Sequence, residues 1–161
     1  MGCDIHAYIE ITEEDGRSFP VAPNGEILRD TEPLVQWSRR VRPHAVDLNR
    51  DYILFSLMAD VRTDDRMRGV EPVKKATYEM PNSEVLREEA AWLDAHSHST
   101  MTADELEEVQ RRYDEVIRRS REAEGAHPYL ASWKRQLRVD HLIATLRWLG
   151  PGARLVFWFD N

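Results

Sequence analysis

The chain is poor in cysteine and has no long hydrophobic run. It contains one cysteine, Cys3, and no apolar stretch approaching the roughly 20 residues needed to span a bilayer. A single cysteine cannot form an internal disulfide, which favours a reducing compartment. The opening MGCDIHAYIE lacks the basic segment of a signal peptide. We therefore expect a cytoplasmic protein without a membrane partner.

Common cofactor and phosphate-binding patterns are also missing. The sequence contains no P-loop, GxGxxG, GxSxG, HExxH or CxxC pattern. Positive charge is in deficit, because 22 Lys and Arg stand against 29 Asp and Glu, for a net charge of −7. Binding to an extended phosphate backbone needs clustered Lys and Arg, so we exclude extended nucleic acid as a partner. A small anionic ligand held by two or three arginines remains compatible with this charge.

The bulk composition is that of one globular domain. Hydrophobic residues make up 42% of the 161 residues and charged residues 32%, which suffices for one core with a charged surface. The chain has no internal repeat, low-complexity tract or obvious linker. We therefore expect a single domain over residues 1–161.

The first strand is the clearest structural signal. Residues 3–12 alternate strictly, with apolar side chains from Cys3 to Ile11 on one face. This period of two predicts a half-buried β-strand with Cys3 as a buried thiol. The other face carries the titratable side chains Asp4, His6, Tyr8 and Glu10.

Turn and capping signals divide the remaining chain. Asp15-Gly16 predicts a tight turn, and Thr102 with Glu105 predicts a capping box. Gly150 predicts the end of the last helix. We expect strands over 3–12, 18–21 and 154–160, helices over 50–61 (capped by Asn49), 83–93, 102–123 and 128–149, and a turn over 94–99.

These elements predict an α+β fold. The continuous apolar run 154–160 is typical of a strand buried on both faces. We expect a small, mainly antiparallel sheet in which this strand lies beside the first, so that the N- and C-terminal strands are central. A helical hairpin, 102–123 with 128–149, and one or two shorter helices pack on it.

Three sets of residues are candidates for chemistry. The first is the polar row of strand one, and the second is the turn over 94–99, where an imidazole pair can hold a cation. The third is the arginines around the helix 50–61, because guanidinium groups and a helix N-terminus bind phosphate oxygens. The predicted ligands of a divalent metal such as zinc or manganese are Asp4, His6, Asp94, His96 and His98.

Several segments together resemble a family of small uncharacterised bacteriophage proteins. These are the opening Met-Gly-Cys-Asp-Ile-His, the Arg50-Asp51-Tyr52 helix start, the His96-Ser97-His98-Ser99 turn and the closing Val-Phe-Trp-Phe-Asp-Asn. Members often carry Gly where this chain has Ala95. The resemblance implies a phage accessory protein in the host cytoplasm, a setting in which such proteins often bind or destroy nucleotide immune signals. It implies no particular mechanism.

Three functions follow as hypotheses. The leading one is capture of a small phosphate-bearing, nucleotide-like ligand by His6, Arg50 and Arg62, with Tyr8 or Tyr52 stacking on a base. The second is a metal-dependent hydrolase, similar to a phosphodiesterase, with Glu10 as general base. The third is a protein-interaction module acting through the mixed-charge helix 102–124. A homo-oligomer with sites at subunit interfaces is compatible with each.

Overall fold

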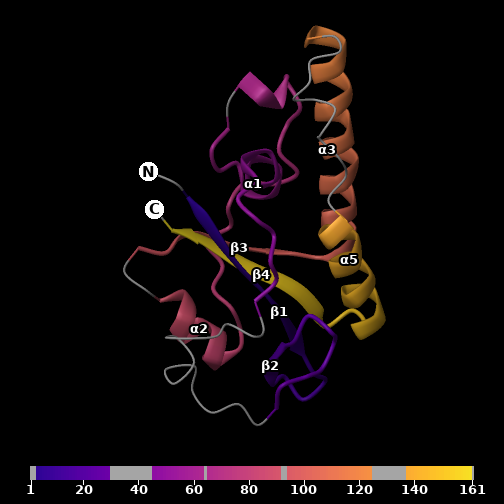
Figure 1. Cartoon of the computed structure of the whole chain (residues 1–161). Helices are drawn as coiled ribbons and strands as arrows, with labels where there is room; N and C mark the ends of the chain where they lie inside the picture. Colours follow the sequence, from indigo (N-terminus) through magenta and orange to yellow (C-terminus); the bar gives the residue numbers. More distant parts are fainter. Residues whose placement is uncertain (1–2, 30–44, 64, 92–93, 125–136, 161) are drawn as a thin grey trace.

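Four strands form one antiparallel sheet at the centre of the molecule (Figure 1). The computed structural model describes residues 3–29, 45–63, 65–91, 94–124 and 137–160. The strands are β1 (Asp4–Thr12), β2 (Ser18–Val21), β3 (His96–Met101) and β4 (Ala153–Asp160), in the order β2-β1-β4-β3. The predicted α+β class is confirmed, as is the central position of the two terminal strands.

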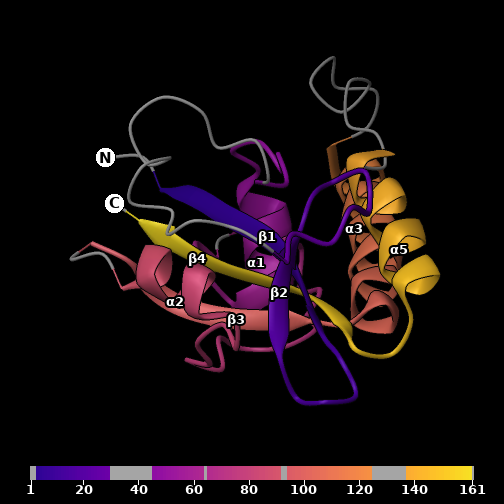
Figure 2. The ribbon, with the colours of Figure 1, turned by 90° about the horizontal axis from the view of Figure 1, so that it is seen from below.

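The helices divide between the two faces of the sheet (Figures 1 and 2). Helix α1 (Tyr52–Ala59) and the paired helices α3 (Ala103–Glu124) and α5 (Leu137–Leu149) share the main core with one face. The short α2 (Glu84–Ala90) lies against the other face. A 3-10 turn, η2 (Asp65–Met67), follows α1.

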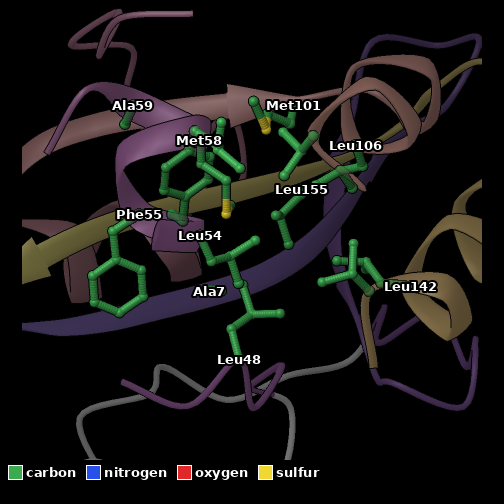
Figure 3. Packing of buried hydrophobic residues seen from close by; sticks show 14 of the residues in the cluster. Ala7, Leu48, Leu54, Phe55, Met58, Ala59, Met101, Leu106, Leu142 and Leu155 are labelled. Atoms are coloured by element: carbon green, nitrogen blue, oxygen red, sulfur yellow. The ribbon is translucent and has the colours of Figure 1, made fainter. Parts of the chain in front are cut away.

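The main core forms where period-two strands meet apolar helix faces. Ala7 and Leu155 project from the sheet toward Leu54 and Met58 of α1, and Leu106 of α3 closes the cluster (Figure 3). All five side chains are fully buried. At roughly 1.5–3 kcal/mol for each large apolar side chain, this face supplies most of the hydrophobic stabilisation.

A smaller apolar cluster forms on the opposite face. It consists of Tyr8, Leu86, Ala90, Val156 and Trp158, with Tyr8 stacked on Trp158 at 5.3 Å between ring centroids. The face that the sequence predicts to be polar is therefore covered along part of its length. Its exposed remainder is the end of the sheet at which β1 begins and β4 ends.

Two helix boundaries depend on caps. The capping box is confirmed, because the Thr102 amide donates to Glu105 and the Glu105 amide donates to Thr102 Oγ1. Asn49 does not cap α1. The Asp51 carboxylate takes that place, accepting from the amides of Ile53 and Leu54 at 3.1 Å each, and Asn49 instead has a φ of 57°.

The turn predicted over 94–99 is wrong, because strand β3 begins at His96. Its polar residues pair irregularly with β4, because a β-bulge or similar irregularity lies between His96 and Ser99. Ser97 within it has a φ of 54°. Of the helix predicted from residue 128, the part over 128–136 lies outside the described residues, as do residues 92–93 of the helix predicted over 83–93.

The mixed-charge surface of α3 neutralises itself. Glu108 pairs with Arg111 and Arg112, and Glu115 pairs with Arg118 and Arg119. These hydrogen bonds lower the pKa of both glutamates to about 2. Intrahelical pairing is typical of a solvated helix, and it gives no support to the interaction-module hypothesis. Among the described helices, none is long and apolar enough to cross a membrane.

The junction of β1 with β4 tolerates no side chain at Gly152. A Cβ atom there would lie 2.3 Å from the carbonyl oxygen of Thr12, and the Thr12 amide donates to the Gly152 carbonyl at 2.9 Å. We expect Gly152→Ala to lower the free energy of unfolding by about 1–3 kcal/mol, because backbone must shift to make room. Urea denaturation measures this, and an unchanged midpoint would contradict the packing.

Candidate functional site

Two ion pairs mark the open end of the sheet. Asp4, the first residue of β1, accepts hydrogen bonds from Arg50, with Nε at 2.7 Å and Nη2 at 2.6 Å. His6 Nε2 lies 2.8 Å from Asp160 Oδ2 at the end of β4. Asp4 and Arg50 are about half exposed, so water and small solutes reach this pair.

The antiparallel register sets these two carboxylates against each other. Asp4 is the direct cross-strand partner of Asp160, and His6 that of Trp158. Directly opposed residues have Cβ atoms about 4.5–5.5 Å apart, a distance at which like charges repel. Arg50 offsets this repulsion through its ion pair with Asp4, and His6 Nε2 lies within hydrogen-bond distance of Asp160. The hydrogen bond and charge of Asp4 raise the pKa of Arg50 above its ordinary value.

Tyr52 gathers further guanidinium groups beside this pair. The Cζ atoms of Arg62 and Arg66 lie 6.0 Å and 5.8 Å from its ring centroid, which is cation–π distance. Its hydroxyl accepts a long hydrogen bond, 3.4 Å, from the amide of Cys3. Three arginines from two ends of α1 thus meet near the start of β1.

The backbone of Arg62 is strained at this point. It has a φ of 60°, in the left-handed region that bulky residues rarely occupy. Such strain costs roughly 1–3 kcal/mol and gathers at functional sites. Here it turns the chain directly after α1 and brings the Arg62 side chain back over Tyr52.

The neighbouring thiol is structural. Cys3 is fully buried, and burial is the main cause that raises its pKa, against the opposing effect of Arg62. A thiol with a raised pKa is a weak nucleophile. The predicted buried Cys3 is confirmed.

The segment leading into α1 holds Arg50 in place. The Val46 amide donates to the Ala7 carbonyl at 2.7 Å, which ties the segment to β1. Asp51 caps α1 and accepts from the Tyr113 hydroxyl of α3 at 2.7 Å. Arg50 therefore lies between two anchors, and its position relative to Asp4 is determined by the fold.

The polar side chains predicted along strand one differ in burial from one end of β1 to the other. Glu10 is completely buried, and its carboxylate accepts from the amides of Asn82 and Ser83 and from Arg154 Nε at 2.8–3.1 Å. It thereby supplies the cap at the start of α2, where Ser83 makes no side-chain cap. In this arrangement Glu10 is a structural anion, which corrects its assignment as a general base.

Tyr8 requires a second correction. Its ring is 4% exposed and is stacked on Trp158 in the smaller apolar cluster. A base therefore cannot stack on it without displacing that cluster. Tyr52 is half-buried beside Arg62 and Arg66, and its stacking role stays a prediction.

The five predicted metal ligands are not brought together. His6 and His98 both stack on Trp158 on one face of the sheet, at 5.9 Å and 6.2 Å between centroids, whereas His96 stacks on Phe159 of the main core. His98 Nε2 lies 2.7 Å from the Ala90 carbonyl, which ties β3 to α2. In the described ranges, which include Asp4 and Asp94, no three His, Cys, Asp or Glu side chains could hold a metal ion.

Two residues of this region, Asp160 and Arg66, are not among the candidates that the sequence analysis names. The signal for Asp160 is the alternation Arg154, Trp158, Asp160 along β4, which places them on the face of His6. Arg66 carries no comparable sequence signal, because its place over Tyr52 depends on η2.

Comparison with known proteins adds no relative. Protein-family models, curated proteins and solved structures were each searched, and none matches this chain. The resemblance to bacteriophage proteins therefore stays a prediction.

The structural role of Glu10 makes a direct prediction. We expect Glu10→Gln to lower the free energy of unfolding by about 1–3 kcal/mol, because an amide nitrogen would face buried N–H donors and Arg154 would keep only one of its two carboxylate partners, Glu79. Urea denaturation measures the loss. Glu14→Gln, in the exposed turn after β1, is the control and is expected to change little. Equal stability of the two variants would contradict the anchoring role.

Proposed function

We propose that the open end of the sheet binds a small phosphate-bearing, nucleotide-like ligand. The observation that carries this proposal is the meeting of Arg50, Arg62 and Arg66 around Tyr52 and the start of β1. Guanidinium groups are suited to phosphate because they donate bidentately and keep their charge.

The existing ion pair supports an exchange mechanism. Asp4 presents one carboxylate oxygen to Nε and Nη2 of Arg50, which is the fork that a phosphate oxygen also uses. In the proposed complex the phosphate takes this place. Asp4 turns to solvent, and Arg62 and His6 contact the remaining phosphate oxygens.

The aromatic contribution comes from Tyr52 and its arginines. A guanidinium plane lying over an aromatic ring has a second flat face, and nucleobases stack on such faces. We propose that the base of the ligand stacks on the outer face of the Arg62 or Arg66 guanidinium, so that Tyr52, the guanidinium and the base form one stack. This replaces the stacking role predicted for Tyr8.

The biological proposal follows the predicted phage setting. A protein that captures a nucleotide without turning it over lowers its free concentration by mass action. In the cytoplasm of an infected cell, this would withdraw a nucleotide immune signal from its receptor. The proposal requires stoichiometric binding of one ligand per site.

Calorimetric titration with a panel of nucleoside monophosphates, diphosphates and cyclic nucleotides tests this function. We expect one class to bind and Arg50→Ala or Arg62→Ala to weaken it by at least about tenfold, since a hydrogen bond to a charged group contributes about 1.5–3 kcal/mol. Arg111→Ala removes the same charge from exposed α3 and serves as control. No binding by the parent, or equal weakening in Arg111→Ala, would contradict the proposal.

Hydrolysis is the second candidate, and one observation favours it. A carboxylate bound to an imidazole, as in Asp160 with His6, is the arrangement that orients a histidine general base. Chromatography of the same titration mixtures separates the two functions. Intact nucleotide after long incubation supports capture, whereas product formed by the parent and not by His6→Gln establishes hydrolysis.

A further inference from the structure

A cavity of about 290 Å³ lies beside the other end of β1. Its apolar walls come from Ile9 of β1, Leu142 of α5, Pro23 and the pair Ala45 and Val46. Ile9 is five residues along the strand from Asp4, a separation of about 17 Å, and belongs to the opposite face. The cavity is therefore distinct from the open end of the sheet.

Polar groups converge on the rim of the cavity from one face of α5. Arg138, His141 and Thr145 follow one another at helical spacing, and all three line the cavity. The Thr145 hydroxyl donates to the His141 carbonyl at 3.0 Å, so its oxygen can still accept. An apolar chamber with a few convergent polar groups is the usual form of a small-molecule site.

Arg138 is held so that part of its guanidinium remains available. Its hydrogen bonds run from Nη1 to Asp47 Oδ2, to the Asp47 carbonyl at 3.4 Å and to Asn49 Oδ1 at 3.0 Å. Within the described part of the chain, Nε and Nη2 make no hydrogen bond. These two N–H donors lie on the same edge of the guanidinium, and a carboxylate can accept from both of them at once.

The charge balance at the rim selects the kind of anion. Asp47 lines the cavity and already holds one edge of Arg138. A phosphate dianion would add two negative charges beside the Asp47 carboxylate, whereas a single carboxylate adds one, which the remaining donors of Arg138 can bind. The apolar walls then require a hydrocarbon body in place of a sugar.

We propose that this cavity binds a small organic acid with one carboxylate and a short apolar body. The carboxylate lies on Nε and Nη2 of Arg138 beside His141, and the apolar body fills the space between Ile9, Val46 and Leu142. This site is independent of the nucleotide-like ligand proposed at the sheet end.

Hexanoate is the probe for this site, and hexanol is its uncharged counterpart. In amide NMR spectra of the full chain, we expect hexanoate to cause saturable shifts over residues 45–47 and 138–145. Arg138→Met is expected to weaken the affinity for hexanoate at least tenfold and to leave the affinity for hexanol unchanged. Thr145→Trp, which fills the mouth of the cavity from the helix surface, is expected to abolish both.

Arg147→Met is the matched control, because Arg147 lies on the same helix but pairs with Asp104 and Glu107 of α3. It is expected to bind hexanoate like the parent. The amide spectrum of each variant shows whether it is folded. No saturable shift in the parent, or equal affinity for hexanoate and hexanol that survives Arg138→Met, would overturn the proposal.

Discussion

The antiparallel pairing of β1 with β4 places Asp4 directly opposite Asp160, and the chemistry of the sheet end depends on this register. Two opposed carboxylates repel each other unless cations hold them. Arg50 is the cation that holds Asp4, and the His6 imidazole binds Asp160 through Nε2; each comes from a position that the fold determines. A slip of one residue in the register would turn Asp4 and His6 to the other face of the sheet and break their contacts with Arg50 and Asp160.

The polar row of β1 shows how one strand serves structure and function together. Its inner member, Glu10, is buried among N–H donors and holds α2 to the sheet. Of its outer members, Asp4 is about half exposed, whereas His6 is stacked on Trp158 and has only 14% of its side chain exposed. The aromatic stack of Tyr8, Trp158 and His6 joins the two regions, so the buried half supports the position of the open half.

Much of this arrangement follows from local sequence signals. Strict alternation over residues 3–12, the capping box at Thr102 and the closing apolar strand are enough to predict the α+β class, the two central strands and the start of α3, but not the edge strand β3. The site is predicted in part. Arg50 pairs with Asp4, and Arg62 lies over Tyr52 near the start of β1, whereas His6 contacts Asp160 and Trp158, so its place beside the arginines stays a prediction.

The remaining features depend on contacts between distant segments. Glu10 and Tyr8 are polar by sequence but are buried by α2, which local pattern cannot place on that face. In a regular strand His96 and His98, two residues apart, would share a face, but the irregular pairing between His96 and Ser99 puts them on opposite faces. The predicted metal set also requires the start of β1 and the segment 94–98 to bring their ligands together, and in the described residues no such group forms.

The most direct test of the central claim is the NMR spectrum of the arginine Nε–H groups during titration with the tightest-binding nucleotide. We predict saturable shifts of the Arg50 and Arg62 resonances with one common affinity, while Arg111 on α3 stays unchanged. Unchanged Arg50 and Arg62 resonances at saturating nucleotide would show that the ligand binds elsewhere, and would contradict the assignment of the sheet end as the binding site.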